Sequence, residues 1–180
     1  AIYDFFWHTY CDWYLELIKT RLYSDNVLER TSAITIARMV MRESLKLLHP
    51  FMPFLTEEVW RGLSLGDGSL LEDESGLPEI IKIDPEAEQT MERIIGIIET
   101  VRTIRGAMNV HPSKSVPLYL NFGEGKEAEE VMTWIEYVKK MARVSEIKLG
   151  KPSKDEHPFG SGIVGEIEIA LPLGDLIDVE

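Results

Sequence analysis

The sequence contains a single cysteine, Cys11, in 180 residues, which excludes an internal disulfide and is typical of a reducing compartment. No apolar run reaches about 18 residues, so no membrane-spanning helix is predicted. The opening residues, AIYDFFWHTY, lack the basic segment and the small-residue cleavage site of a secretory signal peptide. We therefore expect a cytoplasmic protein with no membrane partner.

Signatures of a catalytic site are absent as well. The sequence has no P-loop, no dinucleotide-binding glycine fingerprint, no zinc-protease motif and no Cys-x-x-Cys pair. Its four histidines lie far apart and three of them precede proline, which favours roles at helix ends and turns over metal ligation. Cys11 lies in an aromatic segment and is interpreted as a packed residue. We expect no catalytic residue, metal or other cofactor in this chain.

Basic residues are scarce: 19 Lys and Arg face 31 Asp and Glu, giving a net charge of −12. An acidic balance argues against non-specific binding to nucleic acid. The excess is uneven, because residues 1–50 carry six charges of each sign whereas residues 51–100 carry three basic and twelve acidic ones. A locally basic surface therefore remains compatible with the composition, which at 44% hydrophobic and 28% charged residues is that of a folded protein.

Apolar residues at helical spacing predict helices over residues 2–23, 27–49 and 85–108. A shorter helix is predicted to begin at Thr56, where a capping residue precedes two acids. Together these segments predict a mainly α fold, with an antiparallel helical bundle over residues 1–110.

The pattern changes after His111. The expected elements are a strand over 116–120, a helix over 128–138 and strands over 146–149 and 163–171, the last two joined by a flexible connection over 150–162. Pro117 has no N–H to donate, so an edge position is predicted for the first strand. This small β-α-β-β module is expected to form a second domain over residues 111–180.

One face of the helix over 27–49 carries a column of cationic side chains. Its members recur at steps of four, four and three residues, within about 80° of the helix surface: Arg38, Arg42, Lys46 and His49. Glu29 and Glu43 are expected to project away from this column. Charged columns are common on helices, so an alternative is a purely solvated stripe.

The column leads to the segment His49-Pro50-Phe51-Met52-Pro53-Phe54. Cations beside aromatic faces hold an unstacked nucleotide through phosphate contact and base stacking. We therefore predict that Phe51 or Phe54 protrudes from a rigid turn and stacks on a base. The alternative is that both rings are buried.

A second basic cluster comprises Arg102, Arg105 and Lys114, in a span of residues 102–120 that contains no acid. These side chains either contact nucleic acid or tie the long helix to neighbouring elements. The aromatic residues Trp7, Trp13 and Tyr14 are interpreted as core, because helical spacing favours burial.

Four segments of the sequence resemble segments of one known family. Residues 5–17 read FFWHTYCDWYLEL, which resembles the first helix of the anticodon-binding region of valyl-tRNA synthetases. Residues 47–58, LLHPFMPFLTEE, resemble the family's helix–turn–helix signature, which isoleucyl and leucyl enzymes share more loosely. Residues 104–114, IRGAMNVHPSK, and 171–180, LPLGDLIDVE, are similar to segments of the valyl branch. The four segments bracket the chain in the family's order.

The resemblance implies a bundle that receives the anticodon stem-loop of valine tRNA, within a class I synthetase that activates valine with ATP and Mg²⁺. The family's His-Ile-Gly-His and Lys-Met-Ser-Lys-Ser signatures are missing, as is the coiled coil that follows the closing motif. Helical patterning also begins at Ile2 without an initiator Met. We therefore expect a non-catalytic segment whose partner is the catalytic domain of the same polypeptide.

Valine codons begin with G-U, so a valine anticodon ends in A-C, and these are the bases such a domain has to read. The expected tRNA contacts are, in the first rank, Arg38, Arg42, Lys46, Phe51 and Phe54 and, in the second rank, Arg102 and Arg105. One competing hypothesis is a helical protein-interaction domain whose cationic column meets an acidic partner. Another is the equivalent domain of an isoleucyl- or leucyl-tRNA synthetase.

Overall fold

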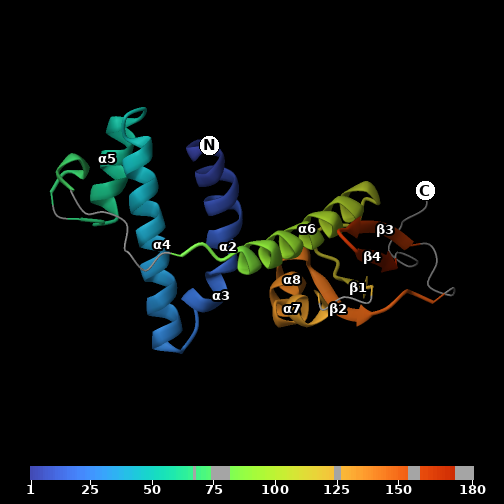
Figure 1. Cartoon of the computed structure of the whole chain (residues 1–180). Coiled ribbons are helices and arrows are strands. Elements are labelled where there is room, and N and C mark those ends of the chain that lie inside the picture. Colours follow the sequence, from blue (N-terminus) through green and yellow to red (C-terminus); the bar gives the residue numbers. More distant parts are fainter. Residues whose placement is uncertain (67, 74–81, 124–126, 154–158, 173–180) are drawn as a thin grey trace. The chain divides into compact units, whose positions relative to one another are not determined.

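The structure, a computed structural model, describes residues 1–66, 68–73, 82–123, 127–153 and 159–172. The chain divides into two compact units, Ala1–Lys82 and Ile83–Glu180, each with its own set of elements (Figure 1). No described helix is long and apolar enough to cross a membrane.

The first unit is helical, as predicted. Its elements are α1 (Ile2–Asp4), the π-helix η1 (Phe5–Tyr14), α2 (Leu15–Leu17), α3 (Lys19–Leu22), α4 (Val27–Leu48), α5 (Pro53–Gly62) and the 3₁₀ turn η2 (Leu70–Glu72). The single helix expected over residues 2–23 is thus several segments, because ten residues adopt π-helical hydrogen bonding; the N–H of Leu15, for example, donates to the Tyr10 carbonyl. Helix α4 begins after Asn26, whose side chain accepts hydrogen bonds from the N–H groups of Leu28 and Glu29.

Helix α5 begins three residues earlier than predicted. Pro53 occupies its first turn, where the missing N–H costs nothing, and Thr56 lies inside the helix instead of capping it. The Thr56 hydroxyl donates back to the carbonyls of Met52 and Pro53, at 2.9 and 3.1 Å. Trp60, a residue of α5, is fully buried against Leu45. Leu65 and Leu70 complete this small core.

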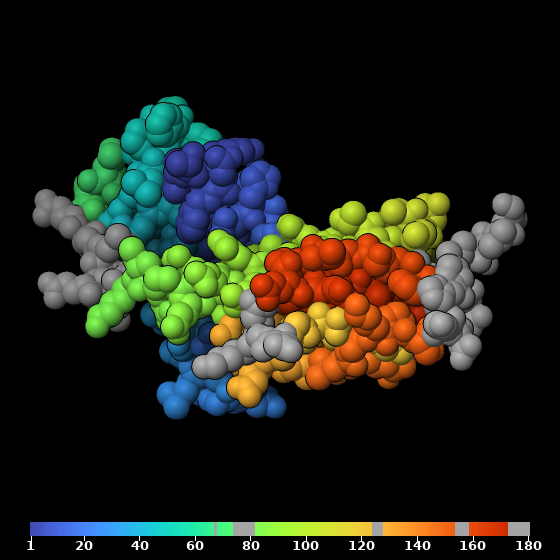
Figure 2. Space-filling view, turned by 45° about the vertical axis from the view of Figure 1, so that its right-hand side comes forward, coloured from blue at the N-terminus to red at the C-terminus, as the bar shows by residue number. Residues whose placement is uncertain are grey.

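The second unit is a four-stranded mixed sheet with helices packed against it. Its elements are α6 (Pro85–Ala107), β1 (Val116–Asn121), α7 (Glu127–Thr133), α8 (Ile135–Ala142), β2 (Val144–Leu149), β3 (Phe159–Val164) and β4 (Ile167–Pro172). The strand order is β2-β1-β4-β3, with β1 parallel to β2 and antiparallel to β4. Helix α6 packs on β3 and β4, and α8 packs on β2 and on α6. Figure 2 shows β2, β3 and β4 at the surface of this unit.

The apolar stripe predicted for the long helix is buried, including Ile94, Ile98 and Val101. It packs against the sheet, so residues 83–110, expected in the bundle, belong to the second unit. Two glycines permit this close packing. A Cβ added at Gly96 would lie 2.9 Å from Val164 Cγ1, and one added at Gly162 would overlap Thr100 Cγ2.

Two details of the predicted module are wrong. The strand expected over 163–171 is the hairpin β3–β4, in which Gly165 supplies a turn with φ of +58°, and β3 already begins inside the expected flexible connection. Strand β1 is central, although Pro117 predicted an edge. The central position tolerates the proline because the β1–β2 register shifts between Val116 and Leu118, which removes the need for a ladder hydrogen bond there.

Candidate nucleic-acid interface

Two phenylalanine rings project where α4 meets α5: Phe51 lies in the turn between the helices and Phe54 in the first turn of α5. The turn closes when the N–H groups of Phe51 and Met52 both donate to the Leu48 carbonyl, at 3.0 and 3.1 Å. The exposed fraction is 78% for Phe51 and 91% for Phe54. Two apolar rings exposed so close together make this part of the surface a candidate interaction site. The prediction that a ring protrudes here is confirmed for both residues.

The turn is held from behind by a buried hydroxyl. Thr56 is 1% exposed, and its Oγ1 lies 2.8 Å from His49 Nδ1. The same oxygen donates to the carbonyls of Met52 and Pro53. The last residue of the cationic column is therefore joined to the segment that carries the two rings.

Arg38, the first cation of the column, reaches the end of α5. Its guanidinium donates to the carbonyls of Leu63 and Ser64, the former at 2.9 Å. These carbonyls belong to the negative end of a helix, which attracts a cation. Arg38 thus connects α4 to the end of α5, and its side chain stays exposed to solvent.

Arg42 and Lys46 are paired with carboxylates. Arg42 Nε and Lys46 Nζ lie 3.0 and 2.9 Å from Asp73 Oδ2, and both nitrogens lie 3.6 Å from Glu43 Oε1. Glu43 was expected to project away from the column, and that expectation is wrong. The midpoint of the column is therefore locally neutralised in this structure.

The second basic cluster has a mainly structural arrangement. Arg105 is 7% exposed and donates to the carbonyls of Arg143, His111 and Lys114, the last at 2.7 Å. Burial and the neighbouring Arg143 lower the pKa of Arg105. Its guanidinium is enclosed and not available to a phosphate. Arg102 is exposed and donates to the Met141 carbonyl at 3.1 Å.

An apolar groove of about 410 Å³ runs between the N-terminal helix and helices α4 and α5. Trp7, interpreted as core from the sequence, lines this groove and is 50% exposed. Beside it, the rings of Phe6, Tyr10 and Tyr14 stack in a ladder with centroids 5.7 and 5.6 Å apart. The breadth of the apolar face was visible in the sequence, but its partial exposure was not.

Cys11 also lines the groove. Burial, reinforced by the charge of Asp12, raises the pKa of its thiol. A raised pKa keeps the sulfur protonated at neutral pH, which is the opposite of what a nucleophilic thiolate requires.

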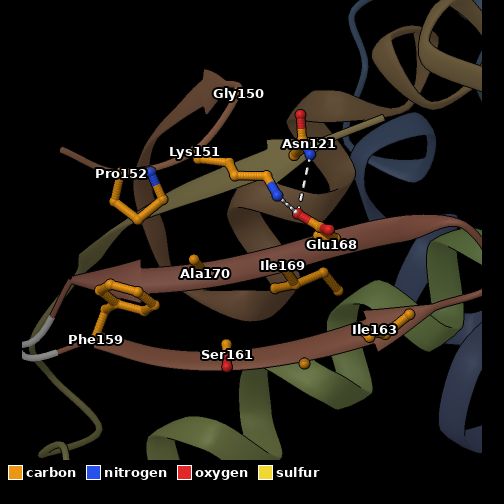
Figure 3. A pocket seen from close by; sticks show the side chains of 11 residues that line it. Asn121, Gly150, Lys151, Pro152, Phe159, Ser161, Ile163, Glu168, Ile169 and Ala170 are labelled. Atoms are coloured by element: carbon orange, nitrogen blue, oxygen red, sulfur yellow. Dashed lines mark hydrogen bonds and ion pairs between the residues drawn. The ribbon is translucent and has the colours of Figure 1, made fainter. Parts of the chain in front are cut away.

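A second hollow lies on the sheet of the other unit (Figure 3). Phe159 and Pro152 border one end, while Lys151 and Asn121 point toward Glu168 at its rim. Glu168 Oε2 lies 2.8 Å from Lys151 Nζ and 3.0 Å from Asn121 Nδ2. These hydrogen bonds, from Lys151 first, lower the pKa of Glu168. A carboxylate held ionised in this way is unsuited to act as a general acid.

The described histidines have local partners. His8 Nδ1 lies 3.3 Å from Asp12, and His111 Nδ1 lies 2.7 Å from the Ser113 hydroxyl. His157 falls outside the described residues, as does most of the closing segment 171–180. Within the described ranges, no three His, Cys, Asp or Glu side chains are grouped as metal ligands would be.

Comparison with known proteins gives the same family as the sequence motifs. Residues 1–120 match the family described as the anticodon-binding domain of tRNA ligase. The whole chain is 36% identical to the valine–tRNA ligase of Syntrophotalea carbinolica over 183 residues, and 37% identical to that of Thermotoga maritima over 184. The chain is 32% identical to the Bacillus subtilis valine–tRNA ligase over 181 residues, which cover 99% of this chain. The chain spans 20% of the length of each of these relatives.

Proposed function

The chain belongs to the family of anticodon-binding domains of tRNA ligases, and from that premise we propose that it receives the anticodon loop of a valine tRNA within a valine–tRNA ligase. The names of the relatives that match along the whole chain support the choice of valine. The single observation that carries the contact site is the pair of protruding rings, Phe51 and Phe54.

The two rings are proposed to stack on unpaired anticodon bases. Anticodon bases are splayed from the loop when a protein reads them, and an aromatic ring replaces the lost stacking. Each such contact contributes about 1–3 kcal/mol. Stacking alone tolerates any base, so discrimination of the terminal A-C requires polar contacts to base edges nearby.

Arg38, Arg42 and Lys46 of the cationic column are proposed to supply those polar and phosphate contacts. Arg38 is at the surface, whereas Arg42 and Lys46 have to exchange Asp73 for a phosphate or a base edge. Arg102 remains a candidate for a peripheral phosphate contact. Arg105 is withdrawn as a direct contact, because its guanidinium is buried and satisfied by three carbonyls.

The remaining parts of the reaction are proposed for the rest of the polypeptide. A catalytic domain there would use ATP and Mg²⁺ to join valine to its tRNA, in the cytoplasm. The apolar groove beside Trp7 has the character of a protein contact, and we assign it to that catalytic domain. This assignment accounts for the exposed apolar surface of the groove.

Binding of isolated RNA stem-loops tests the proposal. The 180-residue chain is titrated with a stem-loop that carries a valine anticodon and with one in which the A-C is altered, each at low and at moderate salt. We expect the valine loop to bind more tightly at both salt concentrations. Equal affinity for the two loops would reject anticodon reading, and preference for an isoleucine or leucine anticodon would reject the valine assignment.

A further inference from the structure

His49 and Thr56 form one hydrogen-bonded unit behind the two exposed rings. Thr56 Oγ1 lies 2.8 Å from His49 Nδ1, 2.9 Å from the Met52 carbonyl and 3.1 Å from the Pro53 carbonyl. Thr56 is 1% exposed, so these contacts are protected from competing water. They connect the end of α4 with the first turn of α5 across the turn that carries Phe51.

The contacts of the unit favour one arrangement of its hydrogen bonds. The Thr56 hydroxyl donates to the carbonyls of Met52 and Pro53, which are acceptors only. Its oxygen then accepts from His49 in the tautomer that carries a hydrogen on Nδ1.

The unit is not needed to satisfy the backbone. The Met52 carbonyl also accepts from the N–H of Thr56, at 3.1 Å, so it keeps a partner when the hydroxyl is removed. His49 is only partly buried, and its Nδ1 can turn to water. What the unit adds is a fixed relation between His49 and the turn, and hence a fixed direction for the rings.

We propose that His49 and Thr56 are positioning residues for anticodon reading: they touch no base themselves and pre-organise the turn from which Phe51 and Phe54 stack. This inference rests on the proposed function. Pre-organisation raises affinity because the turn loses less conformational freedom when RNA binds.

Two matched pairs of variants test the unit in the full 180-residue chain. Thr56→Val removes the hydroxyl at nearly constant shape, whereas Thr56→Ser retains it. His49→Ala removes the donor, whereas His49→Asn retains an N–H donor near the position of Nδ1. We expect Thr56→Val and His49→Ala to weaken binding of the valine stem-loop about fivefold, a part of one stacking contact. Thr56→Ser and His49→Asn are expected to stay within about twofold of the unaltered protein.

A spectroscopic readout separates positioning from general loss of structure. The stem-loop carries 2-aminopurine in place of the anticodon adenine, and its fluorescence is quenched when an aromatic ring stacks on it. With the RNA saturated by protein, we expect weaker quenching with Thr56→Val than with Thr56→Ser. Circular dichroism checks that both variants are folded, and if Thr56→Val is not, the histidine pair decides the question.

Two results would overturn the inference. The first is unchanged affinity and quenching in both Thr56→Val and His49→Ala. The second is a loss in His49→Ala that Thr56→Val does not share, because His49 would then contact RNA directly. Neither result affects the proposed function, which fails separately when the unaltered chain does not distinguish the valine loop from an altered one.

Discussion

Phe54 keeps 91% of its surface in water, so its ring contributes almost nothing to the folded core. Replacing Phe54 with Ala is expected to change the free energy of unfolding by less than about 0.5 kcal/mol. The same change should weaken binding of the valine stem-loop about tenfold, because one stacking contact is lost. Urea unfolding and RNA titration measure the two effects.

Leu28→Ala is the matched control, since Leu28 is 81% exposed at the opposite end of α4. It should leave both stability and RNA binding unchanged. Equal loss of binding in Leu28→Ala and Phe54→Ala would show that the ring has no specific role.

Tyr10 links folding stability to pH. Its hydroxyl donates to the Ala37 carbonyl at 2.8 Å, and burial, with Tyr14 and Cys11 nearby, raises its pKa to about 12. An unfolded tyrosine has a pKa of about 10, so the folded state holds this proton more tightly. The corresponding stability is complete below about pH 10 and is lost as the pH rises toward 12.

At neutral pH the Tyr10→Phe variant should have a free energy of unfolding about 1 kcal/mol lower, because it lacks the hydrogen bond to Ala37. Between about pH 8 and pH 11, urea unfolding should show a smaller loss of stability in Tyr10→Phe than in the unaltered protein. If both proteins lose the same amount, the alkaline sensitivity comes from another group.

At the scale of elements, Asp73 joins η2 to α4 through Arg42 and Lys46. Replacing Asp73 with Asn removes one of the two negative charges, those of Asp73 and Glu43, that lie beside these cations. We expect the free energy of unfolding of the variant to be lower by about 1–2 kcal/mol. The loss is modest because the ion pair is only partly buried. RNA affinity should rise instead of fall, and the dependence of log K on log salt should steepen by about one phosphate contact.

Asp25→Asn is the control for this charge change, since Asp25 is an exposed acid in the loop before α4. It should alter RNA affinity much less than Asp73→Asn. Unchanged RNA affinity in Asp73→Asn would restrict Asp73, Arg42 and Lys46 to a structural role.

The approach of α6 to β3 depends on Gly162. A Cβ at this position overlaps Thr100 Cγ2, so Gly162→Ala should destabilise the second unit by about 1–3 kcal/mol. Thr100→Ser removes the overlapping methyl group and should recover part of the loss. Gly106→Ala serves as the control: it meets no atom within 4 Å and should be neutral or slightly stabilising. Thermal unfolding of the four proteins measures these effects, and a stable Gly162→Ala protein would contradict the close packing.

Apolar periodicity, together with capping residues and prolines, predicted most elements but misplaced some of their ends. Asp84 and Pro85 gave the start of α6 correctly, because capping is a local interaction. Thr56 carried the same local signal, yet its hydroxyl turns back toward Met52 and helps to fix a turn. Pro117 predicted an edge strand, because the one-residue register shift that accommodates it leaves no trace in a single sequence.

At the scale of the whole molecule, the sequence identified which faces are apolar but not what covers them. The apolar face of the long helix, which includes Ile94 and Val101, is buried, and it packs on the sheet of the second unit. The breadth of the N-terminal aromatic face likewise predicted burial for Trp7, which is half exposed. Long-range partners depend on the full set of packing contacts, which local periodicity does not encode.

The candidate site shows the same division. Exposure of Phe51 and Phe54 was predicted as one of two alternatives, because a Pro-bounded turn between helices leaves rings either inward or outward. The carboxylate partner of Arg42 was missed, since Asp73 lies 31 residues away in sequence. The chain has a net charge of −12. The proposed RNA contact by Arg42 therefore requires a phosphate to take the place of Asp73.

Photo-crosslinking is the most direct test that the turn between α4 and α5 meets the anticodon. A valine stem-loop carrying 5-iodocytidine in place of the anticodon cytosine is irradiated in complex with the 180-residue chain, and the linked peptide is identified by mass spectrometry. We predict attachment at Phe51 or Phe54. Attachment within the sheet unit, at residues 116–172, with none at the turn would contradict the proposed interface.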